Sequence, residues 1–204
     1  MPLQPPAEPR PYVSPKRAAA SAETRAQVID AGMRLLAGGP AQLSMEAVAK
    51  AAGVTRLTVY KQFGSRRGLL EAMFDDTARR FGVTRMAEAM SQPDPRAGLR
   101  LAVEILCGFW GSHPSFGQLH EAAAADPEFA DALATRNDRR RMVFDTLLAR
   151  LPGPEAARRD CSDLIFGMTA MPMFRVLITG RTPADVAAVL NAAIAAVLTE
   201  KGLG

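Results

Sequence analysis

Histidine and cysteine are scarce in this chain of 204 residues, which has two of each and a single tryptophan. Cys107 and Cys161 lie in helical patterns without the spacing of metal ligands, so we expect reduced thiols in the core of an intracellular protein. His113 and His120, with Glu121 beside the second, leave a zinc site as an alternative, but a third firm ligand is missing. The sequence has neither a glycine-rich phosphate loop nor a nucleophile motif. These absences argue against an enzyme and against a bound metal or cofactor.

The sequence also lacks an apolar run that would span a bilayer. Its most apolar stretch, residues 164–179, is too short and contains Pro172 and Arg175. Its first residues, PLQPPAEPRPYVSP, have no apolar core like that of a signal peptide. With 48% apolar residues and a mean hydropathy of -0.01, the chain has the composition of a globular protein with a substantial core. We expect a cytoplasmic protein that does not contact membranes.

A helix-turn-helix pattern lies in residues 44–63, SMEAVAKAAGVTRLTVYKQF. Ser44 is expected to cap a short amphipathic helix, Gly53 allows the positive φ of a turn, and Thr55 caps a second helix. In such motifs the second helix enters the major groove of DNA. Its exposed side chains offer cations and hydroxyls to phosphates and base edges: Arg56, Thr58, Tyr60 and Lys61.

Charge is distributed unevenly along the chain. Residues 1–75 contain 10 Lys and Arg against 6 Asp and Glu, whereas residues 76–204 contain 15 of each, so the whole net charge of +4 lies in the first third. A basic first third beside a neutral remainder is typical of a nucleic-acid-binding head on a body that does not bind nucleic acid.

Residues 24–74 resemble the N-terminal domain of the TetR family of bacterial transcriptional regulators. The matching features are the AAGV turn at residues 51–54, the TxxTVY pattern at residues 55–60, Phe63, Ser65 and the pair Leu69–Leu70. The resemblance covers about a quarter of the chain, and the remainder is similar to the family only in its length and its all-helical sequence pattern. The sequence departs from the family pattern at Leu57, at Gly68 and in the loop Gly39-Pro40.

The resemblance implies an all-α fold of about nine helices. A three-helix DNA-binding head would occupy residues 21–68, and a ligand-binding and dimerisation body would occupy residues 69–204. The implied function is that of a sequence-specific transcriptional regulator, a repressor that a small hydrophobic ligand releases from a pseudo-palindromic operator. The alternative is a dimeric regulator without an inducer. The DNA contacts would come from Ser44, Thr55, Arg56, Leu57, Thr58, Tyr60, Lys61 and Arg66.

Several local features are expected from the order of residues. The Pro-rich residues 1–20 form either a basic arm that touches DNA or a solvated tail. Thr24 and Gln27 form a capping box for the first helix. Ser65 caps a fourth helix that contains Gly82, either for close packing or as a hinge. The Arg139–Arg141 run is expected to be a solvated face.

The body is expected to form a helix over about 96–111 and a short helix that follows the break at 112–114 and ends near 125. Further helices are expected over about 127–151, over 155–179 and from 183 onward. Its aromatic and sulphur side chains are candidates for lining an apolar pocket: Phe109, Trp110, Phe116, Met142, Phe166, Met168, Met171 and Phe174. Ordinary core packing is the alternative for each of them. The last two helices have apolar surface in excess, and the resemblance assigns it to a homodimer interface that contains Leu164, Val186, Val189, Ala192, Ala193 and Val197.

Overall fold

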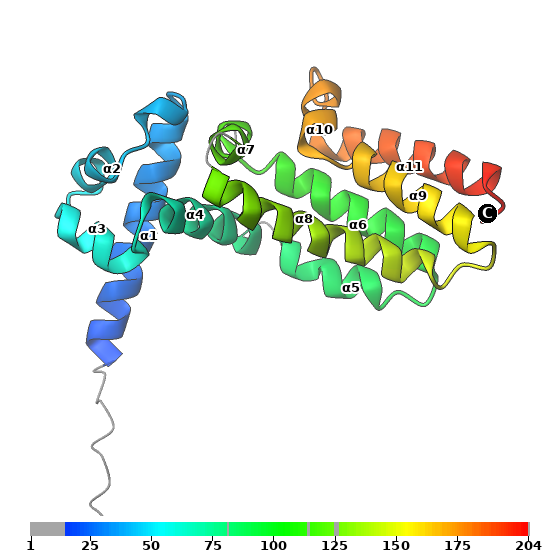
Figure 1. Cartoon of the computed structure of the whole chain (residues 1–204), viewed down its shortest axis with the longest axis horizontal. Coiled ribbons are helices and arrows are strands. Elements are labelled where there is room, and N and C mark those ends of the chain that lie inside the picture. Colours follow the sequence, from blue (N-terminus) through cyan, green and yellow to red (C-terminus); the bar gives the residue numbers. More distant parts are fainter. Residues whose placement is uncertain (1–14, 81, 114, 125–126, 204) are drawn as a thin grey trace, which may run out of the picture.

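A computed structural model describes residues 15–80, 82–113, 115–124 and 127–203. The predicted arm or tail at residues 1–14 lies outside this range. The described part is all-α, as predicted, with the head at one end of an elongated helical body (Figure 1). Two short 3₁₀ turns lie between helices: η1 Pro40–Gln42 follows α1, and η2 Val83–Arg85 follows α4. The described residues form eleven α-helices: α1 Pro15–Leu36, α2 Met45–Ala51, α3 Arg56–Phe63, α4 Arg66–Arg80, α5 Met86–Met90, α6 Pro95–Trp110, α7 Phe116–Ala124, α8 Pro127–Leu148, α9 Glu155–Met168, α10 Met171–Leu177 and α11 Pro183–Glu200.

The head consists of α1, α2 and α3 packed against the first half of α4. The predicted inner stripe of the first helix is buried, and it includes Ile29 and Leu36. Gly32 belongs to this stripe because α1 and α4 approach closely there. A Cβ atom on Gly32 would lie 2.9 Å from the sulphur of Met73 on α4, so a larger residue would require the Met73 side chain to shift in the core.

The body is built around α6, which packs against α5, α8 and α11. Asp94 starts this helix by accepting hydrogen bonds from the backbone N–H groups of Arg96 at 2.9 Å and Ala97 at 3.1 Å. Pro95 occupies the first helical turn, where a missing N–H group costs nothing. The apolar side of α6 is thereby placed in the centre of the body, between α8 and α11.

α4 connects the head to the body (Figure 1). Its Phe74 ring lies 5.5 Å from the ring of Phe109 on α6 and 5.4 Å from that of Phe116 on α7. Such tilted and edge-to-face aromatic pairs add to the free energy gained by burial alone. The second half of α4 therefore belongs to the core of the body, whereas its first residues belong to the head.

Three predicted boundaries near the head are wrong. α1 begins at Pro15 rather than after residue 20, and Thr24 lies inside it, with its hydroxyl donating to the carbonyl of Ala20 at 2.9 Å instead of capping. Gly82 lies outside α4 with φ 84° and starts the turn η2. This left-handed conformation suits glycine and ends a helix, so Gly82 neither packs within the helix nor bends it.

The predicted helix over residues 155–179 is two helices, α9 and α10. The chain leaves helical geometry at Ala170, whose ψ is 151°. Pro172 lies in the first turn of α10; its ring would clash with the carbonyl four residues earlier if the helix continued. The split, together with the short α5 that the pattern did not predict, accounts for eleven helices in place of about nine.

Candidate nucleic-acid interface

Side-chain caps define both helices of the helix-turn-helix motif. The Ser44 hydroxyl accepts the backbone N–H of Ala47 at 3.1 Å, and the Thr55 hydroxyl accepts that of Thr58, also at 3.1 Å. Between the helices, Gly53 has a φ of 67°. These contacts agree with the predicted caps and turn. They also occupy Ser44 and Thr55, so any contact these hydroxyls make with DNA would be added to a capping bond.

The exposed side of α3 carries the predicted DNA-binding side chains. Leu57 is 63% exposed and Tyr60 is 38% exposed, and Arg56 and Lys61 are exposed beside them. The Arg56 guanidinium donates to the Tyr60 hydroxyl at 3.3 Å and lies 5.3 Å from the centre of its ring. A cation, a hydroxyl and an apolar side chain are therefore presented together by one short helix.

The opposite side of α3 is held firmly by the head. Val59 is fully buried and Phe63 is 8% exposed. From α1, the guanidinium of Arg25 lies 4.5 Å from the Phe63 ring and donates to the carbonyl of Gln62 at 3.0 Å. The Gln62 amide in turn donates to the carbonyl of Ser21 at 3.2 Å. Ser21 and Arg25 in the first half of α1 thus fix the end of α3.

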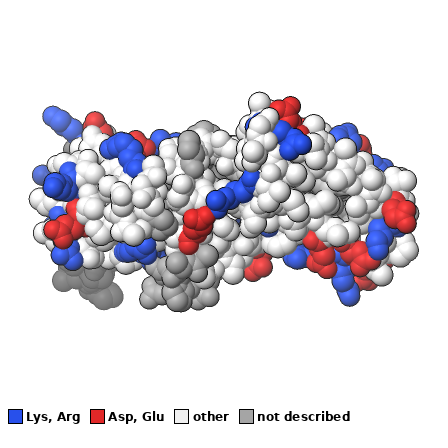
Figure 2. Space-filling view, turned by 90° about the horizontal axis from the view of Figure 1, so that it is seen from above, with Lys and Arg blue, Asp and Glu red and all other residues white. Residues whose placement is uncertain are grey.

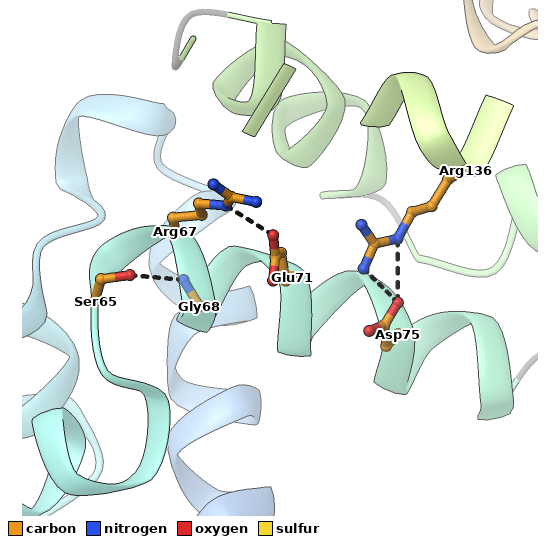
Figure 3. Close-up of polar contacts among 6 residues, drawn as sticks. All are labelled: Ser65, Arg67, Gly68, Glu71, Asp75 and Arg136. Atoms are coloured by element: carbon orange, nitrogen blue, oxygen red, sulfur yellow. Dashed lines mark hydrogen bonds and ion pairs between the residues drawn. The ribbon is translucent and has the colours of Figure 1, made fainter. Parts of the chain in front are cut away.

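The start of α4 is packed tightly against the end of α3. The Ser65 hydroxyl accepts the backbone N–H of Gly68 at 3.1 Å (Figure 3). A Cβ atom on Gly68 would lie 2.0 Å from the carbonyl oxygen of Phe63, which explains glycine at this position. The side chain of Arg66 is half-buried and its Nε donates to the carbonyl of Leu43 at 3.2 Å. The structure thus gives Arg66 an anchoring contact, and its contact with phosphate stays a prediction.

Charged side chains are distributed differently over the two ends of the molecule. In Figure 2, basic side chains lie over the head at the left with a few acidic ones, whereas acidic and basic side chains are interspersed over the body. The body's charges form ion pairs such as Arg141–Asp163 at 2.5 Å and Lys201–Asp160 at 2.6 Å. The charge pattern of the surface therefore follows that of the sequence.

Comparison with known proteins identifies the head. Residues 28–73 match the family described as bacterial regulatory proteins, tetR family. The HTH-type transcriptional regulator EthR of Mycolicibacterium smegmatis is 33% identical over 94 residues, which is 45% of this chain and 43% of the relative. The head belongs to the TetR family. The chain spans less than half the length of this curated relative.

Solved structures share the fold of this protein along most of the chain. A TetR-like transcriptional regulator from Rhodococcus sp. RHA1 matches with a TM-score of 0.69 and 23% identity, over 86% of this chain and 96% of that one. NalD, the secondary repressor of the MexAB-OprM multidrug efflux pump in Pseudomonas aeruginosa, matches with a TM-score of 0.63 and 20% identity, over 86% and 95%. At these identities the likeness establishes the fold, including that of the body.

The body contains a cavity of about 260 Å³ between α4, α6 and α8. Of the predicted pocket residues, Phe109 and Trp110 line it, whereas Phe116 is fully buried against their rings. Most of the wall was not predicted from the sequence. Most of the missed residues belong to α4 and α8, and three come from η2, α5 and α6, but nothing in the sequence marks these faces as a cavity: Phe74, Asp75, Ala78, Val83, Met86, Leu106, Arg136, Asn137, Arg139, Arg140, Val143 and Phe144.

The other predicted pocket residues lie elsewhere. Met171 and Phe174 line a second, more polar hollow of about 350 Å³ beside Trp110. Met142 is 58% exposed, so its prediction as a pocket residue is wrong: it lies on the outer side of α8. Phe166 stacks with Arg140 and Arg141, and Met168 is partly buried against the core; neither lines the first cavity.

Of the predicted interface residues, Leu164 and Val189 are exposed apolar side chains, at 46% and 43%, and Ala192 is exposed. Val186 is fully buried in the core, so its assignment to the interface is wrong. The remaining two, Ala193 and Val197, are partly buried. Among the described helices, α11 alone is long and apolar enough to cross a membrane by length and composition, a test that a core helix of a soluble protein also passes.

The run Arg139–Arg141 is not simply a solvated face. Arg140 donates to the carbonyl of Thr169 at 2.9 Å and lies 4.1 Å from the centre of the Phe166 ring. The zinc alternative finds no support in the described residues, where no group of three His, Cys, Asp or Glu side chains could hold a metal ion. Glu121, its acidic member, forms an ion pair with Arg175.

Proposed function

We propose that this TetR-family transcriptional regulator is a dimeric repressor that binds a pseudo-palindromic operator through α3. The observation that carries the proposal is the exposed side of α3, where Arg56, Tyr60 and Lys61 surround the exposed Leu57. Two copies related by a two-fold axis would present two such helices to successive major grooves, about 34–36 Å apart or a multiple of that distance.

The dimer interface of the proposal is the exposed apolar side of α9 and α11. Leu164 and Val189 are exposed there although both are large and apolar, and Ala192 beside them permits close approach of another helix. Exposed apolar side chains on two helices that contact each other favour association with a partner. A second copy, with its own α9 and α11, would complete a four-helix interface.

The proposed response to a ligand passes along α4. Phe74 and Asp75 of α4 line the cavity, and Asp75 accepts two hydrogen bonds from Arg136 of α8, at 2.6 Å and 3.1 Å (Figure 3). A ligand that widens the cavity would displace this part of α4 relative to α8. Since the same helix begins at Arg66 in the head, the displacement changes the spacing of the two α3 helices in a dimer and lowers the affinity for the operator.

The direct test uses a duplex selected from random sequences by the wild-type protein. Arg56→Ala and Lys61→Ala should each weaken operator binding by about tenfold or more, since a base contact is worth roughly 1–3 kcal/mol and a phosphate contact changes the salt slope by about one. Arg100→Ala, which removes an exposed cation of the body, should bind like the wild type. Wild-type affinity in both α3 variants would refute the proposed interface.

The alternative, a regulator without an inducer, makes a different prediction. In that case a compound that stabilises the folded protein would leave operator affinity unchanged. The cavity that α4 shares with α6 and α8 favours the inducible form, because the bound molecule would touch the helix that carries the head.

A further inference from the structure

The cavity between α4, α6 and α8 combines apolar walls with an excess of positive charge. Three arginines line it, Arg136, Arg139 and Arg140, against one acidic residue, Asp75. Asp75 is already paired with Arg136. The other wall residues, Asn137 apart, are apolar or aromatic. A molecule in this cavity therefore meets hydrocarbon on most sides and uncompensated cationic charge on one.

Arg140 is the decisive side chain because its charge is partly removed from water. Its Nη1 and Nη2 donate to the carbonyls of Thr169, at 2.9 Å, and Phe166, at 3.4 Å. Its Nε is buried and has no hydrogen-bond partner, and no described carboxylate forms an ion pair with it. Burial, followed by the charge of Arg141, lowers the pKa of the Arg140 guanidinium to about 10.

The carbonyls that hold Arg140 do not neutralise it. They belong to the end of α9, where the helix dipole supplies about half of an elementary negative charge. A partly desolvated cation that lacks a full counter-ion is unfavourable, and a bound anion removes that cost. Among the residues that line the cavity, Asn137 has the one amide side chain and none has a thiol or hydroxyl group, so the wall favours an anionic ligand over a neutral polar one.

We infer that the ligand of this cavity is an apolar acid, with a hydrocarbon or single-ring body and one carboxylate held by Arg140. The inference deepens the proposed function and rests on it for the biological consequence. Ligand sites commonly measure about 300–1,000 Å³, so a cavity of about 260 Å³ fits a molecule at the small end of that range.

The test compares three probes of one chain length: octanoate, 1-octanol and octylamine. Trp110 is the only tryptophan of the protein and lines the cavity, so its fluorescence responds to binding there. Because Trp110 also lines the second hollow, the Arg140 variants are needed to assign the signal to this cavity. Octanoate should bind about tenfold tighter than 1-octanol or more, because hydrogen bonds to charged groups are about twice as strong as neutral ones. Octylamine should bind weakest. Equal affinities, a preference for the alcohol or the amine, or no binding of any probe would overturn the inference.

Variants then assign the preference to Arg140. Arg140→Met should bring the affinity for octanoate close to that for 1-octanol, whereas Arg140→Lys should keep most of the preference. Arg141→Met is the matched control, since Arg141 pairs with Asp163 and does not line the cavity. An unchanged preference in Arg140→Met would overturn the assignment. Should that variant fail to fold, the wild-type ranking and Arg140→Lys decide the question.

Operator affinity separates this inference from the proposed function. Octanoate at saturation should weaken operator binding by the wild type at least severalfold. A wild type that binds operator but prefers no acid retains the proposed function and loses the inference. A wild type that prefers octanoate through Arg140 but binds no operator retains the acid site and loses the proposed function.

Discussion

In the head, the free side of α3 is covered with hydrogen-bonding and charged groups, whereas in the body the free sides of α9 and α11 carry Leu164, Val189 and Ala192. The two regions also differ inside. The head combines a small apolar core with caps and side-chain contacts such as that of Arg25 with the Phe63 ring, whereas the body contains a cluster of tilted and edge-to-face aromatic rings beside a cavity. The difference agrees with the proposed roles, in which the head presents one fixed surface to DNA and the body forms the dimer and binds a ligand.

The largest expected effect comes from the aromatic cluster of the body. Phe116→Ala removes a fully buried ring that touches Phe74, Phe109 and Trp110, and the cavity it leaves should lower the free energy of unfolding by about 3–5 kcal/mol. Urea denaturation measures the loss. Phe166→Ala, a half-buried ring at the surface, is the matched control and should lose clearly less. Similar losses in the two variants would mean that the cluster does not dominate the body's stability.

The next effect concerns the apolar side of α11. Val189→Asp should give monomers in sedimentation and reduce operator affinity by about 10²-fold or more, because joining two binding modules raises avidity by about that factor. Val176→Asp is the control: Val176 is 72% exposed but lies on α10. Monomers in Val176→Asp together with dimers in Val189→Asp would move the interface to α10.

Two glycines should respond to alanine with opposite signs. Gly68→Ala places a Cβ atom against the Phe63 carbonyl, and the forced shift should cost about 1–3 kcal/mol of stability. Gly108→Ala, on an exposed side of α6 with no neighbouring atom within 4 Å, should stabilise the protein by about 0.5–1 kcal/mol. Thermal denaturation compares them. A neutral Gly68→Ala would show that the junction of α3 and α4 is looser than its contacts indicate.

The smallest expected effect is a dependence of stability on pH. Burial, followed by the charge of Arg140, lowers the pKa of the His120 imidazole below its usual 6.5. The unfolded chain therefore takes up a proton at a higher pH than folded His120 does, and stability falls as the pH drops below about 6.5. His120→Asn should reduce the fall in melting temperature between pH 7.5 and 5.5. The control is His113→Asn, which removes the chain's other imidazole and should leave this fall in melting temperature unchanged. The reverse result would assign the effect to His113.

The head could be predicted from the sequence almost completely because its signals are local. Ser44, Gly53 and Thr55 each act within three or four residues of their own position. The bend at Pro172 is equally local, yet the apolar run around it obscured the break between α9 and α10. The local signals missed the length of α1. Its early residues are held by a hydrogen bond between Ser21 and Gln62, which lie far apart in the sequence.

The sequence by itself determined the family, the helix-turn-helix and the excess of apolar surface in the last helices. Only the tertiary structure decided how the sides of those helices are used. On α11, Val186 faces the core and Val189 faces outward, and a helix that is apolar on nearly every side carries no local signal to tell them apart. The same holds for Arg140, which lies in a run of three arginines and differs from its neighbours because α9 ends beside it.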